Sequence, residues 1–144
     1  GRVRAIGISN FSVPYLTELM KTARITPMVN QVEFHPGYMQ PETVQMSKDL
    51  GMVVEAWSPL GSGAMLHDPM LVEIADAYGV SVAQLCVRWC LQHHTLPMPK
   101  SVSPERIVQN ADVFGFEISA EDMAKIDALP ESGFSGLHPD RNPF

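Results

Sequence analysis

The sequence has little of the material that several classes of protein require. No apolar run approaches the roughly 18 residues of a membrane span. Only 10 lysines and arginines stand against 16 aspartates and glutamates, and the resulting net charge of −6 argues against a general nucleic-acid binder, because phosphate backbones require a basic surface. No targeting segment is recognisable in the sequence, which opens with GRVRAIGISN, so we expect a cytoplasmic protein.

Cysteine is also scarce. Cys86 and Cys90 are four residues apart in a helical pattern and share a face with Val82, Leu85 and Trp89. This spacing within an apolar stripe favours a buried, reduced pair over a redox or metal site.

The 144 residues, 45% of them hydrophobic, are enough for one ordinary core. Short apolar stretches predict strands at residues 3–8, 28–34, 52–57 and 96–98, each followed by helical sequence. Helix starts are indicated at Ser12, Pro41, Asp68, Ser81, Ser103 and Ser119. Strands that alternate with helices predict an α/β fold with a parallel sheet. The segment 130–144 is rich in glycine and proline, and we expect an irregular tail there.

The number of β/α units restricts the architecture. The first three strands recur at roughly 24-residue intervals, as in repeated β/α units, but a closed barrel needs eight units and about 250 residues. A doubly wound sheet is the alternative. However, no GxGxxG follows any strand, and GSG at 61–63 lies too far from a helix start to serve as that fingerprint.

The stretch LPMPKSVSPERIVQN at 96–110 predicts an anion site. Lys100 and Ser101 lie where a strand ends, and Ser103 with Pro104 begins a helix. Arg106 falls on the first turn of that helix, near its positive end. Two cations, a hydroxyl and unpaired backbone N–H groups therefore converge where phosphate would bind.

Polar side chains also follow the other predicted strands. Ser9 and Asn10 end the first, Gln31 lies on the second, and Trp57 and Ser58 end the third. Parallel α/β proteins bind ligands at the carboxyl ends of their strands. We therefore expect one shared site at this edge.

Five segments together resemble the aldo-keto reductases: VRAIGISNF (3–11), VNQVEFHP (29–36), EAWSPLGSG (55–63), PKSVSPERIVQN (99–110) and FGFEISAEDM (114–123). The ending SGLHPD (135–140) is similar to short-tailed bacterial members such as 2,5-diketo-gluconate reductases. The resemblance implies that residues 1–144 form one partial domain, the carboxyl-terminal half of a (β/α)8 TIM barrel with strands five to eight and their helices.

The resemblance also implies NADP(H) as the cofactor and assigns residues to it. Ser9, Asn10 and Gln31 match the nicotinamide carboxamide contacts, and Trp57 matches the aromatic that stacks on the nicotinamide ring. The remaining matches are Ser58, Leu60 and Ser62 over the pyrophosphate, Lys100, Ser101 and Arg106 on the 2′-phosphate, and Asn110 on the adenine. Gln109 departs from the family, which often has an acidic residue there, so an adenine contact should be weaker.

The catalytic Asp, Tyr, Lys and His of the family lie on the first four strands, which this sequence does not match. Tyr15, Tyr38 and Tyr78 correspond to none of them, and His35 matches a turn position. Glu33 is expected to make a structural polar contact inside the barrel. We therefore expect no catalytic residue in this chain.

The resulting interpretation is part of a reductase of small aldehydes or ketones, inactive alone. Two alternatives remain: a non-catalytic NADP(H)-binding half-barrel that pairs with another half, and a phosphosugar-type barrel enzyme, against which the carboxamide contacts argue. Open strand edges would require the amino-terminal half of the barrel, or self-association of half-barrels, to close the sheet.

Overall fold

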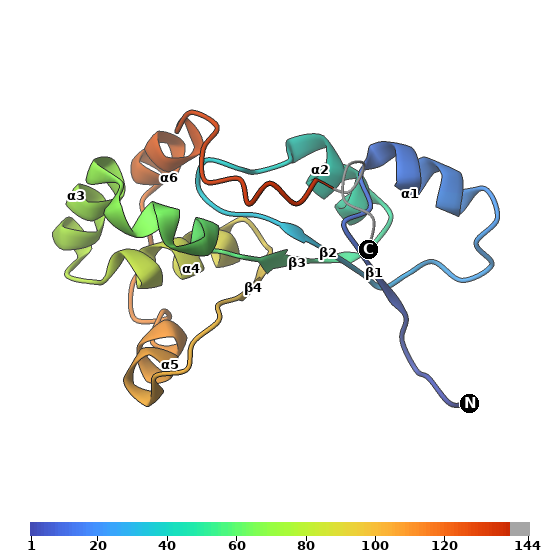
Figure 1. The fold of residues 1–144 in the computed structure, drawn as a ribbon, viewed down its shortest axis with the longest axis horizontal. Helices are drawn as coiled ribbons and strands as arrows, with labels where there is room; N and C mark the ends of the chain where they lie inside the picture. Colours follow the sequence, from blue (N-terminus) through green and yellow to red (C-terminus); the bar gives the residue numbers. More distant parts are fainter. Residues whose placement is uncertain (139–144) are drawn as a thin grey trace.

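The computed structural model describes residues 1–138, and its centre is a sheet of four parallel strands in the order β1-β2-β3-β4 (Figure 1). The strands are β1 (Gly7–Ser9), β2 (Val29–Glu33), β3 (Val53–Trp57) and β4 (Leu96–Met98). Their register pairs Ser9 with Gln31, Gln31 with Glu55 and Trp57 with Met98. The predicted parallel α/β arrangement is confirmed for these residues.

Helices follow each strand. They are α1 (Val13–Met20), α2 (Pro41–Asp49), the 3₁₀ helix η1 (Gly61–His67), α3 (Pro69–Tyr78), α4 (Val82–Gln92), α5 (Pro104–Ala111) and α6 (Ala120–Asp127). Local chemistry sets several of these boundaries. Ser81 accepts from the N–H of Gln84 at 3.2 Å while the Gln84 side chain accepts from the N–H of Ser81 at 3.1 Å. Gly79 ends α3 with a left-handed φ of 67°.

Some predicted boundaries were wrong. The first strand begins at Gly7, not Val3, and Val3 is 69% exposed. A strand must pair with a neighbouring strand. The regular pairing of β1 with β2 begins at Gly7 and Val29, and before it only one backbone bond links the two segments, from the N–H of Met28 to the carbonyl of Ile6. Ser12 precedes α1 without a side-chain cap, and the prediction missed η1, which occupies the loop after β3.

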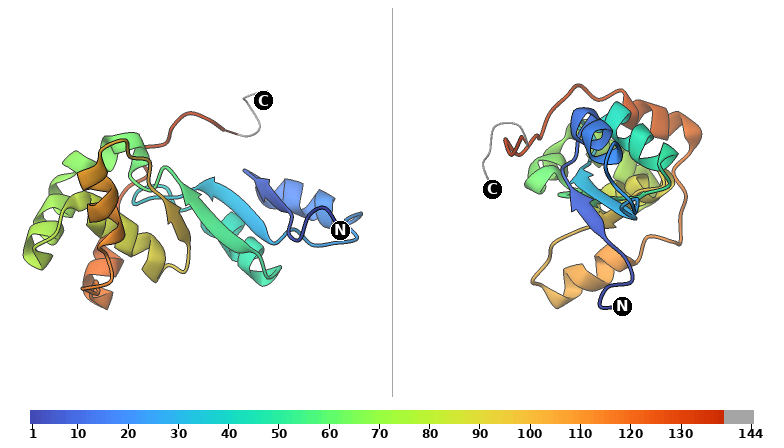
Figure 2. Two further views of the ribbon diagram at one scale, coloured as in Figure 1. Left: turned by 90° about the horizontal axis from the view of Figure 1, so that it is seen from below. Right: turned by 90° about the vertical axis from the view of Figure 1, so that its right-hand side faces the viewer.

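The two faces of the sheet differ sharply in burial. Val32, Val54 and Ala56 are at most 1% exposed, in one core with residues of α3, α4 and α6. The alternate positions lie on the other face, where Val53 is 52% exposed and Met98 49%. Figure 2 (left) shows α2 on one side of the strands and the tail at residues 130–138 passing on the other. We refer to this second face as the open face.

Cys86 and Cys90 lie in this core as free thiols with no exposed surface, as predicted. Burial, with a smaller contribution from Asp68, raises the pKa of Cys86 to about 12. Burial, followed by the neighbouring Cys86, raises the pKa of Cys90 well above its usual value. Both therefore remain protonated and unreactive near neutral pH.

Within residues 1–138, no single helix is long and apolar enough to cross a membrane. Helices α3 and α4 reach that length and apolarity only when taken together, and they are bent by 87° at the break between them.

Candidate functional site

Hydrogen bonds join side chains at the ends of β1 and β3 and link the end of β1 to the backbone of Gln31 on β2. The indole N–H of Trp57 donates to Oδ1 of Asn10 at 2.8 Å. The hydroxyl of Ser9 and the N–H of Asn10 both donate to the carbonyl of Gln31, at 3.1 and 2.8 Å. The structure thus brings Ser9, Asn10, Gln31 and Trp57 together. Gln31 is the central residue of β2 and not its end, but it is the register partner of Ser9, the last residue of β1.

Gln31 is fixed by a partner that the sequence analysis did not identify. Its Nε2 donates to Oε2 of Glu55 at 2.7 Å, and the two residues are register partners on the open face. Because Nε2 is engaged by a carboxylate, the side-chain oxygen of Gln31 has a defined direction. A rigid amide on the open face is suited to recognise another amide.

Three predicted site residues adopt the left-handed conformation without being glycine: Asn10 (φ 58°), Ser58 (φ 50°) and Ser62 (φ 53°). Only two other non-glycine residues in the described part of the chain have positive φ. Such backbone strain concentrates at functional sites. The two serines also contact each other, with their Oγ atoms 3.1 Å apart.

A cavity of about 850 Å³ lies between the loop after β3 and the start of α5. It is lined by seven of the predicted residues: Ser58, Leu60, Ser62, Lys100, Ser101, Arg106 and Asn110. Gln109, the position that departs from the family pattern, also lines it. We call it the strand-end cavity. Trp57 directly precedes Ser58, so this cavity adjoins the group formed by Ser9, Asn10, Gln31 and Trp57.

The cations of the strand-end cavity are available for a ligand. Neither the Lys100 nor the Arg106 side chain has a hydrogen bond or ion pair within residues 1–138. Ser103 caps α5 by accepting from the N–H of Arg106 at 3.4 Å. The same hydroxyl donates to Glu105, and this bond is the main cause that lowers the pKa of that exposed carboxyl. The helix start, Lys100 and Arg106 therefore form a local positive region in an acidic chain.

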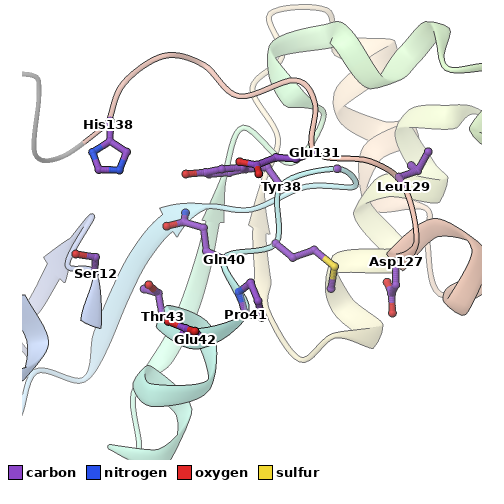
Figure 3. Close-up of a pocket in the computed structure, with 12 residues that line it drawn as sticks. Ser12, Tyr38, Gln40, Pro41, Glu42, Thr43, Asp127, Leu129, Glu131 and His138 are labelled. Carbon is purple, nitrogen blue, oxygen red and sulfur yellow. The ribbon is translucent and has the colours of Figure 1, made fainter. Parts of the chain in front are cut away.

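A second cavity, of about 580 Å³, lies between the loop after β2 and the tail (Figure 3). Tyr38, Gln40, Glu131 and His138 line it, and none of the predicted cofactor residues does. Burial, then Glu33 and Glu131, raise the pKa of Tyr38. The two sides of this cavity are about ninety positions apart in the chain, so no local pattern could have indicated it.

Glu33 and His35 form a buried polar cluster at the carboxyl end of β2, 2% and 0% exposed. Glu33 accepts from the N–H of Ser135 at 2.9 Å and from its hydroxyl at 2.8 Å. The polar contact expected for Glu33 therefore exists, and its partner is the tail. The predicted motif SGLHPD lies partly outside the described residues, since 139 and 140 are not described.

Metal-ligating side chains are not clustered in the described part of the chain. Across residues 1–138, no group of three or more His, Cys, Asp or Glu side chains is arranged to hold a metal ion.

The chain is similar in sequence to known proteins of one family. A model of the aldo/keto reductase family matches residues 1–131. The chain is 51% identical over 140 residues to a glyoxal reductase of Bacillus subtilis, covering 97% of this chain and 51% of that protein. It is 48% identical over 144 residues to an uncharacterized oxidoreductase, YtbE, of the same organism, covering 100% and 51%.

Solved structures give the same result. A mutant of Gox0644 in complex with NADPH has a TM-score of 0.94 and 37% identity, covering 100% of this chain and 54% of that one. MGS-M4, an aldo-keto reductase from a deep-sea metagenome library, has a TM-score of 0.94 and 36% identity with the same coverage. The chain therefore spans about half the length of the relatives it matches.

Proposed function

Because this chain belongs to the aldo/keto reductase family, we propose that it is the cofactor-binding half of an NADPH-dependent reductase. The whole enzyme would reduce small aldehydes or ketones to alcohols by hydride transfer. The observation that supports this most directly is the strand-end cavity, where two unpaired cations meet a helix start. A structural relative binds NADPH, the nucleotide whose 2′-phosphate suits such a site.

The residues present fit this nucleotide. Lys100, Ser101 and Arg106 would hold the 2′-phosphate, with Asn110 toward the adenine. Ser58, Leu60 and Ser62 would lie over the pyrophosphate. Ser9, Asn10, Gln31 and Trp57 would hold and orient the nicotinamide, which supplies hydride when bound.

The groups that protonate the carbonyl oxygen would come from further polypeptide. In the described structure, Tyr15 lies on α1, Tyr38 follows β2 and Tyr78 ends α3, and none lines the strand-end cavity. We therefore propose that these residues are the carboxyl-terminal half of a TIM barrel and are inactive alone. The relatives, about twice as long, have room for the other half.

The exposed apolar surface indicates where the other half would bind. Exposed large apolar side chains occur beside β1, on the open face, and around β4 and α5: Val3, Ile6, Ile25, Met28, Val53, Leu96, Met98, Val102, Ile107, Val108 and Phe114. A single soluble domain rarely leaves such a surface and two strand edges uncovered. We propose that the occupant is the complementary amino-terminal half, which would add strands at both edges.

Without that half, the chain is expected to self-associate. In analytical ultracentrifugation, the chain should sediment as a dimer or larger species, because burying the open face removes apolar surface from water. Met98→Glu places a charge on this face and should shift the equilibrium toward monomer. Val72→Glu, on the exposed side of α3, is the matched control and should leave it unchanged. A folded, stable monomer at all concentrations would contradict the proposed surface.

The functional proposal predicts nucleotide binding without turnover. Titration of the chain with NADPH should show saturable binding, while the chain alone should not oxidise NADPH in the presence of a small aldehyde. Activity should appear when the amino-terminal half of a relative is added. Binding with no activity after this addition would favour the alternative of a non-catalytic NADP(H)-binding module. Absence of binding to either form would exclude both.

A further inference from the structure

The side chain of His35 lies between two segments that are far apart in the sequence. On one side is Gly61, in the loop after β3: a Cβ added there would lie 3.3 Å from Cε1 of His35. On the other is Gly133, in the tail: a Cβ added there would lie 3.1 Å from the same atom. Both glycines have positive φ, 55° and 70°. The absence of side chains at these two positions leaves room for both backbones to lie close to the ring.

Hydrogen bonds hold the ring and the tail in this arrangement. Nδ1 of His35 lies 2.8 Å from the carbonyl oxygen of Pro36, which can only accept, so this nitrogen carries a proton. Nε2 lies 3.4 Å from Oε1 of Glu33. The Glu33 carboxylate in turn binds the N–H and hydroxyl of Ser135. The tail is thus fastened to β2 by a carboxylate that also faces the His35 ring.

We propose that Glu33 and His35 are a positioning pair that fixes the loop at 58–63 and the tail at 133–135 relative to each other. Met65 reinforces the link, since a Cβ at Gly133 would lie 2.8 Å from its Cε and a Cβ at Gly61 would lie 3.2 Å from its Cγ. Displacing the tail would therefore displace the loop. Because that loop lines the strand-end cavity, displacing it would also change cofactor binding, and this consequence rests on the proposed function. The coupling between the tail and the loop does not rest on it.

Hydrogen–deuterium exchange of the full chain, with no nucleotide added, tests the coupling. Gly133→Ala should accelerate exchange by about fivefold or more in peptides covering 130–138 and also in those covering 58–66, because the added methyl group overpacks the site. Gly136→Ala is the matched control: its φ is also positive, at 83°, and its added Cβ would have no heavy atom within 4 Å. It should leave exchange at 58–66 unchanged.

Two milder variants keep the test valid if Gly133→Ala does not fold. Glu33→Gln and Ser135→Ala weaken the attachment of the tail and should accelerate exchange in both segments, whereas Glu131→Gln, on the exposed part of the tail, should not. Faster exchange in the tail with an unchanged 58–66 loop would overturn the proposal. So would equal effects of Glu33→Gln and Glu131→Gln. Because no nucleotide is used, failure of NADPH to bind would leave this result intact.

Discussion

Replacing Trp89 with alanine is expected to lower the free energy of unfolding by about 3–5 kcal/mol, the range for truncating a large buried aromatic side chain. Trp89 has no exposed surface and stacks on Phe34 with ring centroids 4.9 Å apart. Its indole N–H donates to Oδ1 of Asp127 at 2.8 Å. The substitution would therefore leave a cavity between α4 and the sheet. It would also remove one side-chain contact of Asp127 on α6, which keeps another to Nε2 of His93 at 2.8 Å.

Trp89→Phe separates these two contributions. Phenylalanine keeps most of the stacking with Phe34 but cannot donate to Asp127, so a loss of only about 1–2 kcal/mol is expected. Urea denaturation followed by circular dichroism measures the free energy of unfolding of both variants. The protein concentration must be the same for both, because self-association changes the apparent stability. Equal losses for the two variants would show that the packing of the ring is not what stabilises this core.

Replacing Lys100 with methionine is expected to weaken NADPH binding by about 1.5–3 kcal/mol, the range for hydrogen bonds to charged groups. NADH binding should change little, because NADH has no 2′-phosphate for Lys100 to contact. Competitive titration with both nucleotides measures the difference. Lys21→Met is the matched control: Lys21 pairs with Glu18 on α1, outside the strand-end cavity, and its replacement should affect neither nucleotide.

Trp57→Ala gives the complementary pattern. Stacking on the nicotinamide ring does not depend on the 2′-phosphate, so both nucleotides should bind more weakly. If Lys100→Met lowered the two affinities equally, the assignment of Lys100 to the 2′-phosphate would be refuted, while the assignment of Trp57 could still stand.

Much of the fold was predictable because its signals are local. The caps at Asp68, Ser81, Ser103 and Ser119 and the left-handed end at Gly79 each depend on a few adjacent residues. The proximity of Lys100, Ser101 and Arg106 in one cavity was predictable for the same reason, since one loop and one helix start contain all three; their role as an anion site stays a prediction.

Other features depend on contacts between distant segments and could not be predicted. The bonds between Glu33 and Ser135 join positions separated by 102 residues, and nothing near Glu33 indicates which segment covers it. The pairing of Gln31 with Glu55 required the register of two strands. The start of β1 was misplaced because apolar composition at 3–6 does not show whether a neighbouring strand is present to pair with it.

The position of α5 has a thermodynamic consequence. This helix has no buried residue, Ile107 and Val108 are more than half exposed, and Figure 1 shows it set apart from α1 and α2. Its first turn contains Arg106, so a nucleotide held there would restrain a helix that buries no side chain in the core, and that restraint would cost part of the binding energy. Polypeptide that covered Ile107 and Val108 would remove that entropic penalty in advance. By linkage, the nucleotide would then strengthen the attachment of that polypeptide by the same factor by which the polypeptide strengthens nucleotide binding.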